Sequence, residues 1–314
     1  MEQQGKKGVM IVNLGTPSLP NKKEVRLFLK KFLSDKRVID LPRFVWLPIL
    51  HGIILNVRPK KSAKLYQEIW QEEGSPLKIY TEAQQKSLQK ELADYSVKYA
   101  MSYSNPTIEQ VLAEFDQQKV DDLTVIPLYP QYSTTTTASI YDCVTQYYQK
   151  KSHLPTLHFI NDYCDHPLYI ELLIKQIKKV LVQEKIDLLL FSYHGIPVSY
   201  VTKGDDYPNR CNRTTKAVMS HFTELPYQQT FQSKFGPSQW LTPATDETLK
   251  KLPSQGIKKI AVITPGFVSD CLETIEEIES ENKGYFIDNG GETFHYIHPF
   301  NADPDFSRFL AQLV

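Results

Sequence analysis

The sequence predicts an α/β protein with two similar Rossmann-like domains, each a parallel sheet flanked by helices. Short β-rich runs alternate along the chain with segments of helical periodicity, which is the pattern of consecutive βα units. The length of 314 residues exceeds what one hydrophobic core usually supports and favours two domains of about 150 residues. Two strand-and-turn segments of the first half also resemble two of the second half.

The individual elements follow from local pattern. Residues 8–12 form a β-rich run that ends at a Gly/Pro turn, and four apolar side chains then recur at helical spacing, namely Val25, Phe28, Leu29 and Phe32. The pattern predicts further strands over residues 97–103, 123–128 and 187–193. It predicts helices over residues 80–92, 108–115, 168–182 and 304–314.

The resemblance between the two halves indicates a duplication. Leu14-Gly-Thr-Pro17 matches His194-Gly-Ile-Pro197, and Val125-Ile-Pro-Leu-Tyr-Pro130 resembles Val262-Ile-Thr-Pro-Gly266. We therefore expect domains over residues 1–160 and 161–314, with both sets of strand ends opening onto one inter-domain cleft, a usual place for a ligand. The sequence leaves open whether the terminal helix packs on the first domain or on the second.

Composition excludes several classes of protein. Lys plus Arg and Asp plus Glu balance at 36 each without a basic stripe, which argues against a nucleic-acid partner. The four cysteines lie far apart and show no zinc-ribbon or disulfide spacing. No dinucleotide, P-loop or nucleophile-elbow motif follows any predicted strand. Residues 1–7 lack an apolar signal core, so a cytoplasmic protein is expected.

Residues 44–57 form an uncharged apolar stretch with two interpretations. The stretch is shorter than the roughly 20 residues of a membrane-spanning helix, and Pro48 interrupts it. It could be a buried helix pair or loop. Alternatively, it forms an apolar lip beside a hydrophobic ligand, or a patch in peripheral contact with the inner membrane surface.

His194 is the first candidate for chemistry, because it follows the apolar run 188–191 and precedes Gly195, which permits close approach by a ligand or another backbone segment. The carboxyl end of a strand is where ligands bind in open α/β sheets. An imidazole there can accept a proton or bind a cation. A structural histidine bonded to a backbone carbonyl is the alternative. The other histidines, including His295 and His298, lack this context.

Asp270, Glu273 and Glu277 are the carboxylate candidates. On a helix that begins near Ser269 they would stack along one face, where they repel one another unless a cation or shared protons relieve the repulsion. A solvated acidic first turn favoured by the helix dipole is the alternative for the first two. Carboxylates together with the imidazole of His194 suit a divalent ion such as Fe²⁺.

Two motifs resemble the signature blocks of the ferrochelatases: Ser192-Tyr-His-Gly-Ile-Pro197 and Pro265-Gly-Phe-Val-Ser-Asp-Cys-Leu-Glu-Thr274. Supporting blocks run through the chain at Asn13-Leu-Gly-Thr-Pro17, Phe32-Leu-Ser-Asp35, Gly74-Ser-Pro-Leu77, Tyr129-Pro-Gln-Tyr-Ser133, Gly204-Asp-Asp-Tyr-Pro208, Ser233-Lys-Phe-Gly-Pro237 and Trp240-Leu-Thr-Pro243. The resemblance implies the class II chelatase fold with a porphyrin cleft. It also implies insertion of Fe²⁺ into protoporphyrin IX, which gives protohaem with release of two protons in the last step of haem biosynthesis.

The resemblance also implies roles for individual residues. His194 matches the family histidine that accepts pyrrole protons, and Glu273 matches the facing glutamate that assists metal insertion. Both are thus candidate catalytic residues and metal ligands, while Asp270 and Glu277 extend an acidic track. Porphyrin contacts are expected at Leu14, Arg58, Tyr66, Ser75, Tyr129, Ser133 and Trp240, with residues 44–57 as the apolar lip.

Departures from relatives bear on the subtype. No cysteine follows Cys271, so we expect no iron–sulfur cluster of the kind that animal relatives carry, and no other cofactor. The coproporphyrin-using Gram-positive branch has a tyrosine where this chain has Leu14, which favours protoporphyrin IX. A coproporphyrin ferrochelatase, a cobalt or nickel tetrapyrrole chelatase and a non-catalytic porphyrin carrier are the alternatives. The sequence does not specify the oligomeric state.

Overall fold

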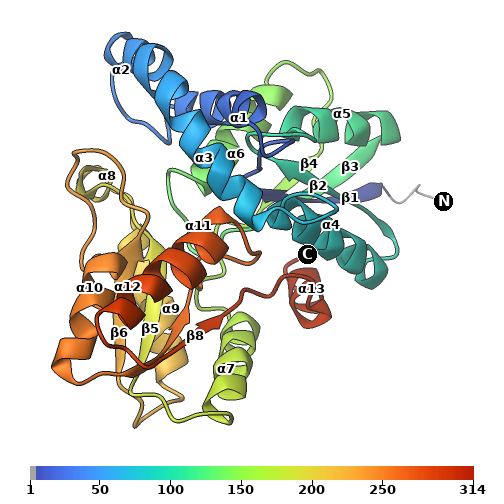
Figure 1. Ribbon diagram of the computed structural model, residues 1–314. Coiled ribbons are helices and arrows are strands. Elements are labelled where there is room, and N and C mark those ends of the chain that lie inside the picture. The colour runs from blue at the N-terminus through green and yellow to red at the C-terminus, as the bar shows by residue number, and fades with distance from the viewer. Residues whose placement is uncertain (1–4) are drawn as a thin grey trace. The chain divides into compact units, whose positions relative to one another are not determined.

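The computed structural model describes residues 5–314, which form two compact units, each with its own parallel sheet and flanking helices (Figure 1). The first unit comprises the chain up to Asp162 together with Asn301–Val314, and the second comprises Tyr163–Phe300. The predicted α/β fold with two similar domains is therefore confirmed.

The first sheet has the strand order β2-β1-β3-β4, with every neighbouring pair parallel. Its strands are β1 (Lys6–Asn13), β2 (Tyr95–Met101), β3 (Val120–Pro127) and β4 (Thr156–Phe159). The apolar run Val9–Val12 of β1 is fully buried, as expected for a central strand covered on both faces. The carboxyl ends of β1 and β3 therefore lie side by side at one edge of the sheet.

The helices of the first unit include one from the far end of the chain. They are α1 (Lys22–Ser34), α2 (Arg43–Ile49), a π-helix (Leu50–Ile54), α3 (Leu55–Ile69), α4 (Pro76–Glu91), α5 (Ile108–Gln118), α6 (Thr137–Tyr148) and α13 (Pro304–Ala311). The side-chain amide of Gln84 on α4 donates to the carbonyl of Asn301, 2.8 Å away, just before α13. The terminal helix thus packs on α4.

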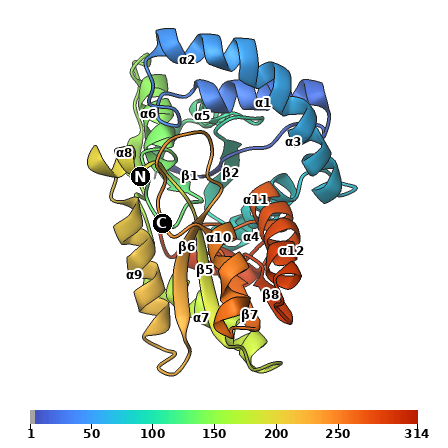
Figure 2. The ribbon, with the colours of Figure 1, turned by 60° about the vertical axis from the view of Figure 1, so that its left-hand side comes forward.

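The second sheet has the order β6-β5-β7-β8, again fully parallel (Figure 2). Its strands are β5 (Leu188–His194), β6 (Tyr227–Gln232), β7 (Lys259–Ile263) and β8 (Thr293–Ile297). Its helices are α7 (Pro167–Leu181), α8 (Val198–Thr202), α9 (Tyr207–Met219), α10 (Thr245–Lys251), a 3₁₀ turn (Leu252–Gln255), α11 (Leu272–Thr274), a π-helix (Ile275–Asn282) and α12 (Lys283–Asp288).

The predicted duplication is confirmed by the strand orders. β1 and β5 hold the same place in their sheets, and so do β3 and β7. The turn that begins at Leu14 follows β1, and the matching turn begins at His194, the last residue of β5. In both sheets the order reverses between these two strands, the place where open α/β sheets bind ligands.

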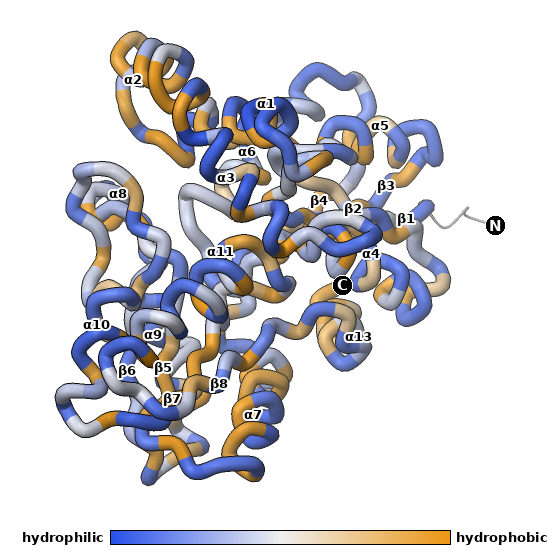
Figure 3. Tube along the Cα trace, viewed as in Figure 1, coloured by the Kyte–Doolittle hydropathy of each residue, from blue (hydrophilic) through white to orange (hydrophobic). Residues whose placement is uncertain are grey.

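The apolar stretch 44–57 is exposed, so its interpretation as a buried helix pair or loop is wrong. Phe44 is 82% exposed, Val57 70% and Ile53 58%, whereas Trp46 and Leu50 anchor the segment in the unit. Figure 3 shows the resulting run of apolar residues around α2. Within the described part of the chain, no helix combines the length and apolar character needed to cross a membrane.

Candidate active site

His194 is the last residue of β5 and is partly exposed. Its Nδ1 atom lies 2.7 Å from the carbonyl oxygen of Gly195. Because a carbonyl can only accept a hydrogen bond, Nδ1 carries the proton, and the Nε2 lone pair of the neutral ring is left to accept one. The backbone contact expected of a structural histidine is present, but it engages only one of the two ring nitrogens.

Gly195 brings other parts of the second unit close to His194. A side chain here would lie 3.0 Å from the carbonyl oxygen of Gln232 and 3.2 Å from the ring of Trp240, so the predicted close approach at this glycine is confirmed. Pro197 pairs with Trp240 in an isolated antiparallel bridge, and the indole N–H of Trp240 donates to the carbonyl of Phe235 at 2.9 Å. The indole is therefore held beside the histidine turn.

Glu277 is anchored at the end of the neighbouring strand. β6 ends at Gln232, the register partner of His194, and Ser233 follows it with a left-handed backbone (φ 64°). The backbone N–H of Ser233 donates to Glu277 Oε1 at 2.7 Å and its hydroxyl donates to Oε2 at 2.5 Å. The Gln232 side-chain amide lies 3.4 Å from Oε2. Three donors thus hold one carboxylate at the carboxyl edge of the sheet.

The electrostatics of this edge join His194 to the two glutamates. Burial raises the pKa of Glu277 above its ordinary value, and the charge of Glu273 acts in the same direction. The hydrogen bonds from Ser233 and the charge of His194 oppose that rise. Glu273 is partly exposed, and its backbone carbonyl accepts the Gln232 amide at 2.7 Å. The carboxyl of Glu277 can therefore hold a proton more readily than an exposed one.

The prediction of one regular helix from near Ser269 is wrong. α11 begins at Leu272 and changes into a π-helix at Ile275, so Asp270 precedes the helix and does not stack with the glutamates on one helical face. The Thr274 hydroxyl accepts the backbone N–H of Cys271 at 2.9 Å, and this bond sets the later start. Short π-helical segments are frequent at functional sites.

Asp270 is buried and fully engaged. Its Oδ1 accepts from the Thr274 hydroxyl at 2.8 Å and from the Tyr296 hydroxyl at 3.3 Å, and its Oδ2 lies 2.9 Å from His298 Nδ1. A buried carboxylate requires such partners. These contacts tie Asp270 to the end of β8, and its place in an acidic track stays a prediction.

In the first unit, four of the six expected porphyrin-contacting residues gather at the carboxyl edge of the sheet. Leu14 follows β1, and Tyr129 and Ser133 follow the adjacent β3. Ser75 joins them because its hydroxyl accepts that of Thr16, in the turn after β1, at 2.9 Å.

The other two expected porphyrin contacts, Arg58 and Tyr66, lie on α3, which packs on α1. Tyr66 is buried, and Arg58 is partly exposed. Their contact with a porphyrin stays a prediction.

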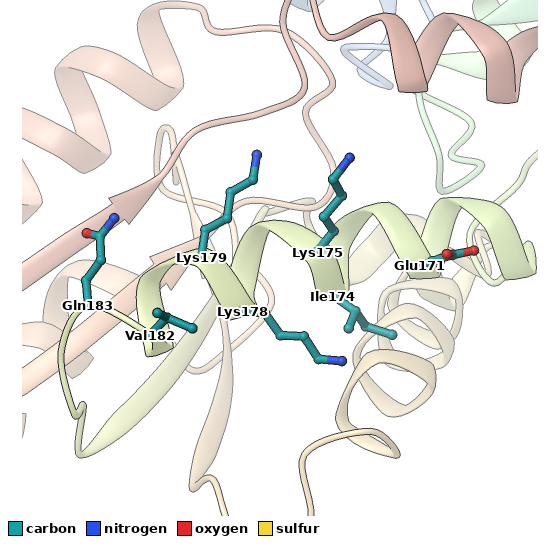
Figure 4. A pocket seen from close by; sticks show the side chains of 7 residues that line it. All are labelled: Glu171, Ile174, Lys175, Lys178, Lys179, Val182 and Gln183. Atoms are coloured by element: carbon teal, nitrogen blue, oxygen red, sulfur yellow. The ribbon is translucent and has the colours of Figure 1, made fainter.

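A hollow of about 670 Å³ along α7 takes no part in this site (Figure 4). It is lined mainly by Glu171, Ile174 and the lysines 175, 178 and 179. α7 leads into the amino end of β5, the opposite edge of the sheet from His194.

The residues described, 5–314, contain no group of three or more His, Cys, Asp or Glu side chains that could hold a metal ion. Iron ligation by His194 and Glu273 therefore stays a prediction.

Sequence reasoning missed the residues that hold the candidates in place. Gln232 ends β6, the strand beside the histidine strand, and Ser233 follows it at the start of the block Ser233-Lys-Phe-Gly-Pro237, which was the available signal. His298 gave no signal, because its partner Asp270 is 28 residues away and only the fold joins them.

Comparison with known proteins identifies the family of the chain. The family model described as Ferrochelatase matches residues 6–314. Coproporphyrin III ferrochelatase of Enterococcus faecalis is 52% identical, covering 98% of each chain, and Ferrochelatase of Sodalis glossinidius is 47% identical, covering 99% of this chain and 94% of that one. SirB from Bacillus subtilis with Fe³⁺ shares the fold, with TM-score 0.60 at 12% identity, covering 98% of this chain and 95% of that one. The chain belongs to the ferrochelatase family.

Proposed function

We propose that this protein inserts Fe²⁺ into protoporphyrin IX and releases two protons, with His194 as the proton acceptor. The observation that carries the proposal is the fixed imidazole of His194. Its Nδ1 is hydrogen-bonded to the carbonyl of Gly195, which leaves Nε2 as the basic atom, and Ser233 anchors the Glu277 carboxylate at the end of the neighbouring strand. A base and a carboxylate so arranged suit removal of the pyrrole protons.

The reaction needs a site that binds a bent ring and a base that removes the pyrrole protons. A flat porphyrin presents its two pyrrole N–H groups in the ring plane and blocks the metal, so a site that binds a bent ring favours the transition state. A base must then take the protons as they leave. The raised pKa of Glu277 makes this carboxyl a suitable next acceptor after His194.

Iron is a substrate of this reaction, and no resident cofactor is proposed. We assign Glu273, which is partly exposed beside Glu277, to receive Fe²⁺ together with His194. Imidazole and carboxylate are suitable ligands for this ion. Asp270 accepts a hydrogen bond from Thr274, the neighbour of Glu273 in the chain, and so helps to hold Glu273 in place.

Apolar residues are proposed to contact the porphyrin ring, and polar residues are proposed to bind its propionates. Trp240 and the exposed lip, residues 44–57, are proposed as walls against the ring. Arg58, Tyr66 and Ser75 are proposed to bind the propionates, since an arginine can bind a carboxylate through two hydrogen bonds. Leu14, Tyr129 and Ser133 are assigned to the ring edge.

We further propose a cytoplasmic location, with the lip in peripheral contact with a membrane. Its exposed apolar side chains, Phe44, Ile53 and Val57, carry this proposal.

The test is an anaerobic assay with Fe²⁺ and protoporphyrin IX. We expect the protein to produce the Soret band of haem and His194→Ala to lower kcat by about 100-fold or more, because a positioned base contributes that much. His295→Ala is the matched control, since His295 contacts Glu184 at a partly exposed site outside this cluster. Unchanged turnover in His194→Ala would contradict the assigned role.

Coproporphyrin III is the second candidate substrate, favoured by the relative that is 52% identical. Coproporphyrin carries four propionates, whereas protoporphyrin replaces two of them with apolar vinyl groups. Leu14 supports protoporphyrin, because an apolar side chain at the strand end suits a vinyl group better than a carboxylate.

The two substrates are distinguished by kcat/KM measured for each porphyrin with the wild-type protein and Leu14→Tyr. We expect the wild-type protein to prefer protoporphyrin and the phenol of Leu14→Tyr to shift the ratio towards coproporphyrin by about tenfold, the effect of one new hydrogen bond to a charged group. A wild-type preference for coproporphyrin would establish the second candidate instead.

A further inference from the structure

His298 is a half-exposed histidine just beyond β8, and one of its nitrogens bonds to a buried carboxylate. Nδ1 lies 2.9 Å from Asp270 Oδ2, and Asp270 is 2% exposed. The hydroxyl of Tyr296 reaches the other oxygen of the same carboxylate. Donors from the end of β8 therefore converge on Asp270.

A chain of hydrogen bonds leads from Asp270 to the beginning of the π-helix. The Thr274 hydroxyl donates to Asp270 Oδ1 at 2.8 Å and accepts the backbone N–H of Cys271 at 2.9 Å. Thr274 is the last residue of α11 and directly precedes the π-helix Ile275–Asn282. Glu273 is its chain neighbour, and Glu277 lies three residues beyond it.

The surroundings restrict the His298 ring on several sides. The ring of Tyr296 packs edge-on against it, with centroids 4.7 Å apart. Glu279 Oε1 lies 3.7 Å from His298 Nε2, and the side-chain amide of Gln176 donates to the backbone carbonyl of His298 at 3.1 Å. The charged and titratable groups that face the imidazole are thus Asp270, Glu279 and the Tyr296 phenol.

We propose that His298 is a positioning residue that acts through Asp270 to hold the start of the π-helix in the place where Glu273 and Glu277 meet His194. The expected loss of catalytic rate rests on the function proposed above. The expected loosening of the π-helix does not depend on that function.

The physical reason is the cost of an unpaired buried carboxylate. Without the His298 donor, Asp270 Oδ2 would lose a hydrogen bond in a site that water reaches poorly, so Asp270 would move or take up a proton. Either change alters the bond to Thr274, which sets where the helix begins. A displacement of about 1 Å at reacting groups can cost as much as 100-fold in rate.

The experiment compares His298→Leu, which removes the donor, with His298→Asn, whose amide can replace it. His295→Leu is the control, because His295 lies in the same strand region but contacts Glu184 instead. Two quantities are measured in each variant: hydrogen–deuterium exchange of the backbone amides over residues 272–282, and kcat and KM for porphyrin in the anaerobic haem assay.

We expect His298→Leu to speed exchange over residues 272–282 and to lower kcat by about tenfold, the effect of losing a supporting hydrogen bond, with little change in KM. His298→Asn should restore most of the exchange protection and most of kcat, and His295→Leu should resemble the wild type in both quantities. Unchanged exchange in His298→Leu, or equal losses in the leucine and asparagine variants, would overturn the proposal.

Failure of the proposed function would give a different result, because the wild-type protein itself would then form no haem. The exchange measurement would still test whether His298 holds the start of the π-helix. If His298→Leu does not fold, Tyr296→Phe supplies the second test. It removes the other β8 donor to Asp270 and keeps the ring, so it should speed exchange over the same residues. Wild-type exchange in this folded variant would likewise overturn the proposal.

Discussion

Ser233 shows how one residue can anchor a largely buried carboxylate. Its left-handed backbone directs both its N–H and its hydroxyl to Glu277, whose pKa is raised by burial. The two donors limit that rise because they stabilise the charged form. The pKa of Glu277 is thus raised by burial and held back by its two donors.

The His298–Asp270 pair predicts how stability depends on pH. The hydrogen bond to Asp270 raises the pKa of His298, and burial opposes the shift in part. Since the folded pKa lies above the unfolded value of about 6.5, the pair stabilises the fold fully below about pH 6.5. This stabilisation is lost as the pH rises through the folded pKa. The effect is modest, because His298 is half exposed.

We therefore expect the wild-type protein to lose more stability than His298→Asn between about pH 6 and pH 9, since asparagine does not titrate in this range. Urea unfolding of both proteins across the range measures the difference, with other titrating groups common to the two. Parallel stability curves would mean that the pair does not link protonation to folding.

At the scale of elements, the π-helix and the lip differ most from what the sequence predicts. The spacing of carboxylates from Asp270 onward is that of a regular helix, and nothing local indicates a start at Leu272 or a π-helical turn. Thr274 bonds to Asp270, and the fold holds Asp270 through Tyr296 and His298 at the end of β8. For residues 44–57 the sequence left two alternatives, and the exposure of Phe44 and Val57 excludes the buried one, while contact with a ligand or a membrane stays a prediction.

The exposed lip leads to a prediction about membrane binding. Burial of an apolar side chain of this size contributes roughly 1.5–3 kcal/mol, so Phe44→Glu and Val57→Glu should each weaken binding to anionic lipid vesicles by about tenfold or more. Co-sedimentation with vesicles measures the effect. Val182→Glu is the matched control, because Val182 is 88% exposed but lies at the end of α7. Equal binding by all three variants and the wild type would rule out the lip as the contact.

At the scale of the whole molecule, the chain repeats one topology and assigns different chemistry to each copy. Equivalent strands β1 and β5 end in matching turns, yet one presents Leu14 and the other His194. Duplication thus accounts for the matching strand ends, and divergence of single residues places an apolar side chain at one and an imidazole at the other.

The first unit is completed by the last helix of the chain, and its stability should depend on that helix. Phe306 on α13 is fully buried, so Phe306→Ala should cost about 3–5 kcal/mol of the free energy of unfolding of this unit. Denaturant unfolding followed by a probe in the first unit measures the loss. Gln312→Ala, at an exposed position after the same helix, should change little. A similar small effect for Phe306→Ala would show that α13 adds little to the fold.

Local pattern was sufficient for the fold class and for the strands that end at the recognised turns, because apolar periodicity and turns act over neighbouring positions. It gave no indication of β4, β6 or β8. It also named His194 and Glu273 as candidates, whose roles stay predictions. Local pattern was not sufficient to predict the hydrogen bonds that hold the candidate side chains in place. Ser233 and Glu277 are 44 residues apart, and the Gln84 side chain and the backbone carbonyl of Asn301 are 217 apart. Such pairs form only when the strands and helices between them pack, so the tertiary structure alone decides which carboxylate is anchored, where the π-helix starts and which unit the last helix completes.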